Sequence, residues 1–416
     1  MAKELANKSI NPELPSGTRD YLPKEYLPKQ KMLDTIRATF ELFGFSPIET
    51  SSLQREEVLT GGDENFKKQI FAVSNTDDED STLALRFDLT VPMARLVSSS
   101  GDKIERPFKR YEIGKVWRGE KAQAGRYREF LQCDADIVGS ASPLSDAEII
   151  SLIYETMRAL GLENFFIKIN SRAALANLDQ NQIRILDKLD KIGEDKVREE
   201  LERAGVTKKI IDDTLNGVFM NQVKEIDGVI EYAESLGVPK KFMKKDPTLA
   251  RGLGYYTGIV FEAVLSDMPE VGSVFGGGRY DNLVEQFGGS QTPAVGVSVG
   301  IDRLFTALDK KDLIKGEKKP VKVLVLNFDN SCTAECLKIV SDLRKEKIGA
   351  EIYFGKEETL KGQLSFAVKN EYEVVVIVGQ QEKERGIAQI KNMVARTQEE
   401  TILKNVSITV KNILNS

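Results

Sequence analysis

The chain has 416 residues, of which 41% are hydrophobic and 30% charged, and its formal net charge is −5 with a pI of about 5.4. This length exceeds one ordinary hydrophobic core, so two or three domains are expected. The balanced composition excludes a disordered or fibrous chain. The acidic balance argues against indiscriminate nucleic-acid binding, although a local basic patch can still bind RNA.

Histidine is absent from the sequence. A Ser-His-Asp triad, a Cys-His pair and an imidazole zinc site are therefore excluded. Any proton transfer must use carboxylates, tyrosine, lysine, water or the substrate. Cys133, Cys332 and Cys336 are too scattered for a disulfide framework. The last two have helical spacing, where small apolar side chains are a better interpretation than a metal pair, and no metal ligands are predicted.

The N-terminal residues lack the apolar segment and the small-residue cleavage site of a secretory signal. The longest apolar runs, such as 373–379, have the length of a strand and are too short to span a membrane. We therefore expect a cytoplasmic protein with no membrane partner.

The first 300 residues have the pattern of an α+β domain. Residues 1–14 show no apolar periodicity, and residues 26–43 have apolar side chains at helical spacing. β-Branched or alternating segments follow with few helical crossovers, which favours an antiparallel sheet flanked by helices. The expected extended segments are 47–53, 69–73, 107–118, 128–140, 257–265 and 294–300.

Residues 172–248 have a helical pattern with mixed charges and no clear strand, which predicts a helical insertion with solvated faces. The charged, proline-bounded stretch 309–322 predicts a linker. We therefore expect a first domain at 1–318, with the insertion at 172–248 inside it, and a second domain at 319–416.

Beyond the linker, strands and helices alternate, which predicts a small α/β domain of about a hundred residues. The expected strands are 322–327, 350–354 and 373–379, the expected helices are 331–346 and 357–369, and a last pair of strands is expected near 387–391 and 401–409.

Two strand-like segments around a polar loop predict a long hairpin at residues 107–136. Arg118 and Glu120 lie where the first strand ends, and Phe130 lies where the second begins. An arginine can clamp a phosphate with its planar fork, and a phenylalanine can stack on a purine. A basic surface hairpin without a ligand is the alternative.

Gln132, Asp134 and Asp136 follow each other at a spacing of two, which places them on one face of a strand. Carboxylates buried on such a face need a cationic or donor partner. A site for a small, positively charged molecule would supply one. Solvated acids on an edge strand are the alternative.

Asp88, Leu89 and Thr90 follow a predicted strand end and begin a predicted helix. Aspartate and threonine are good helix caps, and the same carboxylate and hydroxyl could hold an ammonium group.

Three further segments contain candidate site residues. Arg251 lies among glycines, followed by Tyr255 and Tyr256 entering a strand. Residues 276–280 predict a turn where the backbone closely approaches another group. Arg303 lies in the first turn of a predicted helix, where a cation is electrostatically misplaced unless it binds an anion.

Together these segments resemble the class II aminoacyl-tRNA synthetases, and in particular the histidyl-tRNA synthetases. RYEIGKVWRGE and GRYREFLQCDADIVG are similar to the second class II motif, and AVGVSVGIDRLF is similar to the third. RGLGYYTG is similar to the segment that distinguishes the histidyl enzymes. The resemblance runs from residue 14 to residue 305, and 322–416 fits the family's anticodon-binding domain.

The resemblance implies a histidine–tRNA ligase that converts histidine and ATP, with Mg²⁺, to histidyl-adenylate and transfers the histidine to tRNA(His). It also implies a homodimer with helix 26–43 at the interface. Arg118 and Arg251 would be catalytic, with Arg251 acting where many class II relatives use a metal. The ATP site would be Arg118, Glu120, Phe130 and Arg303. The histidine site would be Asp88, Leu89, Thr90, Gln132, Asp136, Tyr255 and Tyr256, of which Asp136 and the two tyrosines would read the imidazole.

Two other functions stay open from the sequence. A synthetase-like regulatory subunit of histidine biosynthesis would bind histidine without catalysis, but such proteins commonly lack the C-terminal domain and the signature arginines. A sensor that only binds uncharged tRNA would normally be attached to an effector domain, for which this chain has no room.

Overall fold

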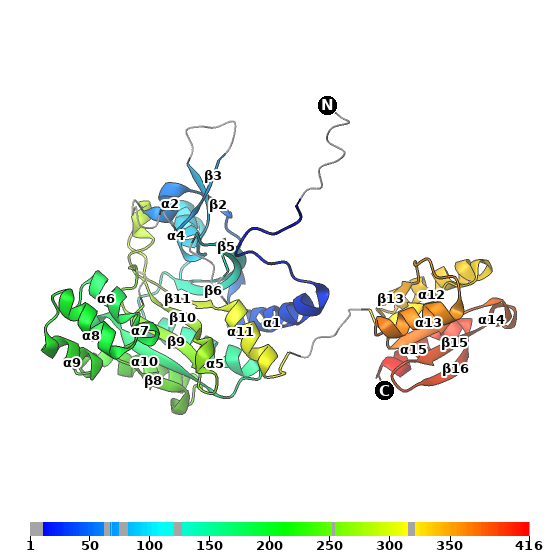
Figure 1. Ribbon diagram of the computed structural model, residues 1–416. Coiled ribbons are helices and arrows are strands. Elements are labelled where there is room, and N and C mark those ends of the chain that lie inside the picture. Colours follow the sequence, from blue (N-terminus) through cyan, green and yellow to red (C-terminus); the bar gives the residue numbers. More distant parts are fainter. Residues whose placement is uncertain are drawn as a thin grey trace. The chain divides into compact units, whose positions relative to one another are not determined.

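The structure is a computed structural model in which residues 11–61, 67, 69–74, 82–119, 127–251, 254–314 and 321–415 are described. These residues form two compact units (Figure 1). One contains residues 11–20 and 29–314, and the other contains residues 21–28 and 321–415. Among the described residues, no helix is both long and apolar enough to cross a membrane.

The first unit is built on an eight-stranded sheet in the order β1-β5-β6-β11-β10-β9-β7-β8. Its six central strands are antiparallel, while the edge strands β1 and β8 pair in parallel with their neighbours. The expected α+β fold is confirmed, although the sheet is mixed at its edges. The strands are β1 Ser46–Pro47, β5 Phe108–Trp117, β6 Glu129–Val138, β7 Phe165–Ser171, β8 Met243–Lys245, β9 Ile259–Leu265, β10 Ser273–Arg279 and β11 Ala294–Val299.

One face of this sheet packs on the main hydrophobic core. The covering helices are α1 Pro23–Leu42, α5 Pro143–Ala159, α10 Lys224–Ser235 and α11 Ile301–Lys310. In α1, Met32, Ile36 and Phe40 repeat every four residues and are all buried, which accounts for the helix expected at 26–43. The core residues of each strand alternate with residues on the opposite face, so that face is left for a polar site.

A smaller sheet in the order β2-β4-β3 belongs to the same unit. Its strands are β2 Leu53–Arg55, β3 Phe71–Val73 and β4 Leu83–Leu85, and its helices are α2 Glu56–Thr60 and α4 Thr90–Ser100. Val91 of α4 packs with Ala84 of β4 in a separate small core. Residues 86–89 connect β4 to α4. In the predicted Asp88-Leu89-Thr90 segment, Asp88 and Leu89 thus precede the helix and Thr90 is its first residue.

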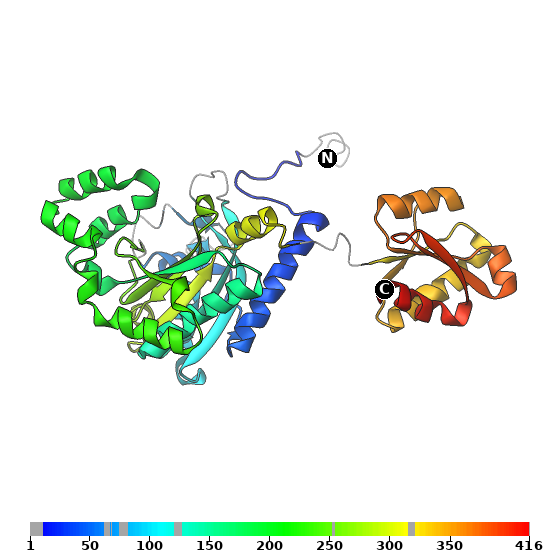
Figure 2. The same ribbon diagram turned by 90° about the horizontal axis from the view of Figure 1, so that it is seen from below.

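The region expected to be a helical insertion contains α6 Gln180–Leu186, α7 Leu189–Ile192, α8 Glu194–Arg203 and α9 Lys208–Leu215. These four helices share their own core and gather on one side of the sheet, drawn in green (Figures 1 and 2). The expectation of no strand in 172–248 is wrong at β8, where only Met243 is buried and the two lysines mask a short edge strand. The boundaries at 172–248, 1–318 and 319–416 stay predictions.

Two further strands differ from the expectation. Residues 165–171, for which no strand is expected, form β7. Residues 276–280, expected to be a turn, instead lie in or directly after β10, between β9 and β11. Three consecutive glycines favour a turn by propensity, but the two neighbouring strands supply the pairing that overrides it.

The second unit holds a five-stranded sheet in the order β13-β12-β14-β15-β16, parallel in its first three strands and antiparallel afterwards. Helices α12 and α15 cover one face and α13 the other, which confirms the α/β class. The elements are β12 Val323–Val325, α12 Thr333–Lys345, β13 Ala350–Ile352, α13 Leu360–Lys369, β14 Val374–Ile377, α14 Gln380–Arg385, β15 Ile387–Asn392, β16 Thr397–Ile402 and α15 Val406–Asn415.

The strand expected at 401–409 is wrong, because β16 ends at Ile402 and α15 follows. Val406, Ile408 and Val410 alternate, which favours a strand on sequence alone. In the structure Val406 and Val410 are buried, whereas Ile408 is 61% exposed. The spacing that matters is i, i+4, which places one stripe of a helix on the sheet.

Candidate active site

Two rows of side chains cross the face of the large sheet that lies opposite the main core. Strand register places them side by side, because directly paired residues share a face. The first row is Glu112, Asp134, Ser298, Gly276 and Glu262, and the second is Arg110, Asp136, Gly296, Gly278 and Val260. The predicted acidic face of β6 therefore lies at the centre of the sheet, and the alternative of solvated edge-strand acids is wrong.

Asp136 and Arg110 are neighbours in the second row and form an ion pair. Both are almost fully buried, and Arg110 Nη2 lies 2.6 Å from Asp136 Oδ2. The Tyr280 hydroxyl also donates to Asp136. Burial raises the pKa of Asp136, while the Arg110 charge opposes that shift. Asp136 thus has one cation and one hydroxyl to offset the cost of burial.

Asp134 belongs to the first row and is 2% exposed. Its oxygens accept from Gln132 Nε2 at 2.7 and 3.0 Å and from the Thr90 hydroxyl at 3.4 Å. Burial, together with the neighbouring Asp136 charge, raises the pKa of Asp134 to about 7. Gln132 Oε1 is buried and accepts no hydrogen bond from any described residue.

The Asp88-Leu89-Thr90 segment lies at the start of α4. Asp88 Oδ1 accepts from the Val91 N–H at 3.0 Å, so the predicted capping role is real. Its other oxygen, Oδ2, is buried and accepts no hydrogen bond from the described residues. Burial raises the pKa of Asp88 to about 6. Leu89 is fully buried, and Thr90 is 8% exposed.

A second buried ion pair fixes this corner. Arg86 Nη1 lies 2.7 Å from Glu112 and donates to the Thr50 carbonyl at 2.7 Å, while Arg86 Nε donates to the Lys115 carbonyl. A methyl group at Gly114 would overlap the Arg86 guanidinium. The arginine two residues before Asp88 is therefore tied to β5, which holds the start of α4 against the sheet.

Tyr255 and Tyr256 lie just before β9, with their ring centroids 4.8 Å apart. Tyr255 also contacts Tyr280 edge to face at 5.8 Å, so the tyrosines approach the Asp136 pair. Burial raises the pKa of both Tyr255 and Tyr256. At neutral pH each hydroxyl therefore keeps its proton and can donate a hydrogen bond. Tyr280 is absent from the predicted set, because its link to Asp136 spans 144 residues of sequence.

Arg251 lies over the first row. Its Nη1 is 2.7 Å from Glu262 Oε1, and its guanidinium lies 5.8 Å from the Tyr256 ring centroid. The side chain is 20% exposed, so part of it is left accessible to a ligand. Gly276 leaves the room that the guanidinium needs.

The predicted nucleotide residues lie on neighbouring elements. The Arg118 guanidinium is 5.0 Å from the Phe130 ring centroid, and Arg118 Nε donates to the Phe87 carbonyl at 3.2 Å. Arg303 lies in the first turn of α11, as expected, and donates to the Ser273 carbonyl at 3.0 Å. Glu120 lies outside the described residues.

The buried carboxyl groups predict an unusual pH dependence of stability. Burial raises the pKa of Asp88 and Asp146 to about 6 and that of Asp134 to about 7, above the 3.8 of a free aspartate. At these three groups the folded state binds more protons than the unfolded state between pH 4 and 7, so their contribution to stability is full below pH 4 and is lost as pH rises through 6 to 7.

The chain has no histidine, so no imidazole group of the protein titrates between pH 4 and 7. We expect the free energy of unfolding to fall by a few kcal/mol from pH 5 to pH 8, since one pKa unit is worth about 1.4 kcal/mol. Urea unfolding of the free protein at pH 5, 6, 7 and 8 measures this slope. A profile that is flat or rises with pH would contradict it, and Asp134→Asn should flatten its upper part.

Comparisons with known proteins agree on one family. Residues 17–213 and 169–304 match the histidyl-tRNA synthetase family, and residues 321–413 match the anticodon binding domain. The histidine–tRNA ligase of Clostridium tetani is 38% identical, covering 99% of this chain and 100% of that protein. The histidine–tRNA ligase of Rhodopirellula baltica is 37% identical, covering 96% of this chain and 97% of that protein.

Solved structures agree with these relatives. The histidyl-tRNA synthetase of Nostoc sp. PCC 7120 superimposes with a TM-score of 0.82 at 32% identity, covering 97% of this chain and 100% of that chain. An ATP phosphoribosyltransferase regulatory subunit/histidyl-tRNA synthetase from Bacillus halodurans C shares the fold with a TM-score of 0.71 at 24% identity, covering 86% of this chain and 97% of that chain. From its full-length relatives and both of its domain matches, the chain belongs to the histidyl-tRNA synthetase family.

Proposed function

We infer that this chain is a histidine–tRNA ligase, which activates histidine with ATP and transfers it to the 3′ end of tRNA(His). One observation carries the assignment to this site. Asp88 Oδ2 and Gln132 Oε1 are buried acceptors without a partner among the described residues, and Arg251 lies on the same face of the sheet. An amino acid fits this arrangement, with its ammonium group at the acceptors and its carboxylate at the arginine.

The first step joins the histidine carboxylate to the α-phosphate of ATP. A carboxylate oxygen forms a bond to α-phosphorus while the bond to the β-phosphate oxygen breaks, so pyrophosphate leaves and no proton moves. This chemistry needs positioning and charge neutralisation. Arg118 holds the α-phosphate and Arg251 neutralises charge between the carboxylate and the phosphate. The step is thus compatible with a chain that has no histidine.

The remaining ATP contacts are assigned to Phe130, Arg303 and Glu120, of which only the first two lie among the described residues. Phe130 presents its ring beside Arg118 and stacks on the adenine. Arg303 binds the outer phosphates from α11, and Glu120 assists the nucleotide.

The imidazole of histidine is read by Asp136, Tyr255 and Tyr256. An analogue without ring nitrogens would leave these buried groups unpaired, which discriminates strongly against it. The tyrosines keep their protons, because burial raises the pKa of each. Asp136 offers an acceptor, and the Tyr256 hydroxyl, which itself accepts from Tyr255, offers a donor to a ring that has both functions.

Magnesium enters with ATP as its counter-ion. Within the described part of the chain, no three acidic or cysteine side chains form a group that could hold a metal. Mg²⁺ prefers phosphate oxygens and water to such a sparse set of side chains. MgATP is therefore the substrate form, and Arg251 supplies protein charge at the reacting carboxylate.

The regulatory-subunit function is less well supported. The relatives named as histidine–tRNA ligases match almost the whole chain, including the C-terminal domain. The three proposed phosphate- and carboxylate-binding arginines are in the chain: Arg118 directly after β5, Arg251 between β8 and β9, and Arg303 in α11. A protein that only binds histidine needs neither a phosphate-binding arginine nor an anticodon domain.

Histidine-dependent ATP–pyrophosphate exchange tests the proposal. We expect the purified protein to return label from pyrophosphate into ATP only when histidine is present. Protein that unfolds cooperatively yet shows no exchange would overturn the ligase assignment and favour the regulatory one.

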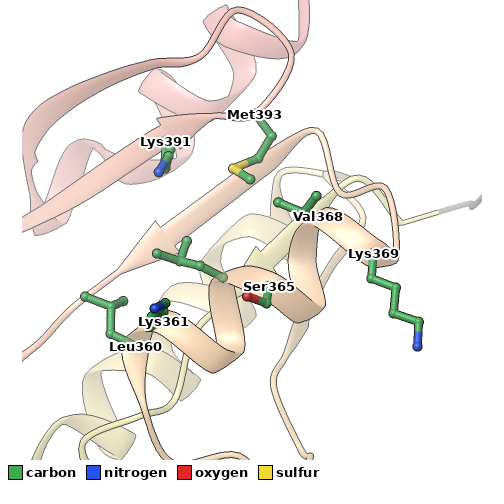
Figure 3. A pocket seen from close by; sticks show the side chains of 8 residues that line it. Leu360, Lys361, Ser365, Val368, Lys369, Lys391 and Met393 are labelled. Carbon is green, nitrogen blue, oxygen red and sulfur yellow. The ribbon is translucent and has the colours of Figure 1, made fainter.

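We place the anticodon loop of the tRNA in a groove of the second unit, between α13 and β15. Apolar side chains, among them Leu360, Val368 and Met393, line the groove together with Lys361 and Lys391 (Figure 3). Apolar side chains can accept unstacked bases, while lysines neutralise the adjoining phosphates. Leu360, Lys361, Leu364, Ser365, Val368, Lys369, Lys391 and Met393 line it.

Charge reversal at the groove should separate the two steps of the reaction. We expect Lys361→Glu with Lys391→Glu to raise the KM for tRNA by about tenfold or more, because each lost phosphate contact weakens binding. Histidine-dependent exchange should stay unchanged. A matched control is Lys338→Glu with Lys345→Glu on α12, outside the residues that line this groove. An equal effect of both pairs would remove the groove from the anticodon contact.

We also propose a cytoplasmic homodimer with α1 at its interface. Light scattering of the purified protein measures the mass. A monomer at micromolar concentration that is active in exchange would overturn the dimer.

A further inference from the structure

Asp134 lies on β6 between Gln132 and Asp136, which are both proposed to bind histidine. The family resemblance assigns no role to Asp134 itself. Among the described residues, no lysine or arginine forms an ion pair with it, since Arg110 pairs with Asp136. Its carboxylate collects neutral donors instead. Gln132 Nε2 donates to both oxygens at 3.0 and 2.7 Å, the Thr90 hydroxyl donates at 3.4 Å, and the Ser298 hydroxyl donates as well.

The contact with Gln132 determines which way its amide faces. Above its raised pKa of about 7, ionised Asp134 only accepts hydrogen bonds, so the amide nitrogen then points at Asp134 and the amide oxygen points away. That oxygen, Oε1, is buried and has no partner among the described residues. The Thr90 hydroxyl likewise donates its hydrogen to Asp134. The lone pairs of its oxygen can therefore accept a hydrogen bond from a ligand.

The site thus offers three acceptor oxygens, as many as an ammonium group has N–H bonds. Gln132 Oε1 and Thr90 Oγ1 are turned into acceptors by Asp134, and Asp88 Oδ2 is an acceptor whose partner oxygen already caps α4. An amide turned the other way would present its own N–H groups to the ammonium group, which is repulsive. The contacts with Asp134 are the hydrogen bonds that distinguish these two orientations among the described residues.

We propose that Asp134 is a positioning residue for the substrate ammonium group, acting by fixing the orientations of Gln132 and Thr90. The proposal rests on histidine being the substrate of this site. It differs from a purely structural role, because the orientation of an amide affects one end of the ligand and leaves the imidazole and ATP contacts in place.

Asp134→Asn tests the idea with the smallest change of shape. The new amide can either accept from Gln132 Nε2 or donate to Gln132 Oε1, so the orientation is no longer fixed. Hydrogen bonds to charged groups are strong enough that we expect the KM for histidine to rise about ten- to a hundredfold. The KM for ATP should change less than about twofold. Thermal unfolding confirms that the variant is folded.

Two ligands make the readout specific to the ammonium group. Histidinol has the ammonium group and the imidazole, whereas 3-(imidazol-4-yl)propanoate has the imidazole without an ammonium group. Asp134→Asn should weaken binding of histidinol and leave binding of the propanoate nearly unchanged. An equal loss for both ligands would show a general disturbance of the pocket and overturn the proposal.

A double-mutant cycle tests whether Asp134 acts through Gln132. In a Gln132→Met background there is no amide to orient, so Asp134→Asn should have a much smaller effect on the KM for histidine. The same fold-change in both backgrounds would overturn the positioning role.

The outcomes also separate this proposal from the ligase assignment. If the wild-type protein shows no histidine-dependent exchange, the assignment of the substrate fails. If the wild-type protein exchanges and Asp134→Asn keeps the wild-type KM for histidine, only the positioning role fails.

Discussion

Arg251→Ala is expected to reduce histidine-dependent ATP–pyrophosphate exchange by about a hundred- to a thousandfold while the protein stays folded. The guanidinium is proposed to neutralise charge where the carboxylate meets the α-phosphate, and removing a preorganised charge of this kind typically costs about 10²–10³ in rate. In the free protein its side chain pairs with Glu262 at 2.7 Å and is 20% exposed, so we expect the fold to tolerate its loss. Exchange assays and urea unfolding measure the two quantities.

Arg251→Lys is the matched control for charge. Lysine keeps the positive charge but loses the planar fork that reaches carboxylate and phosphate together. We expect it to recover only a small part of the activity. An Arg251→Ala protein with wild-type exchange would contradict the catalytic role, and an unfolded one would show that the Glu262 pair holds the sheet.

The part of the site on β6 could be predicted from the sequence, since it depends on local periodicity. In a strand, a spacing of two places Gln132, Asp134 and Asp136 on one face, independently of tertiary contacts. The structure confirms that shared face and adds its burial. The residue types at 88–90 likewise predict the start of a helix, which α4 confirms.

The partners of these acids could not be predicted in the same way. Arg110 reaches Asp136 from the neighbouring strand, and Tyr280 reaches it from 144 residues away. Both contacts depend on strand order and register, which no local pattern contains. The role of Asp134 is hidden for the same reason, because spacing reveals an acid on a face but not which amide it orients.

Misjudged elements have a common physical cause. The alternation of residues 406–410 and the glycines of β10 both give a local preference that tertiary packing overrides. In β10 the sequence does carry a usable signal, the expectation that the backbone at 276–280 approaches another group closely. That expectation is correct at Gly276, where the neighbouring group is the Arg251 guanidinium.

Gly276→Ala should therefore abolish most activity without unfolding the protein. A methyl group at this position would overlap the end of the Arg251 side chain. Because that end is flexible, it can move aside at little cost to the fold. The displaced guanidinium then no longer reaches the carboxylate and the α-phosphate, and a shift of about 1 Å can cost about a hundredfold in rate. Exchange assays and urea unfolding again measure the two effects.

Gly277→Ala is the matched control in the same strand. Its side chain would point to the opposite face, where a methyl group would overlap the Gly296 carbonyl and come within 2.8 Å of the Phe261 ring. Backbone cannot move aside cheaply, so we expect Gly277→Ala to destabilise the fold and Gly276→Ala to spare it. Wild-type exchange in Gly276→Ala would mean that the guanidinium works from another position. Equal loss of stability in both variants would mean that these glycines serve only the packing of β10, and that the room beside Arg251 has no catalytic purpose.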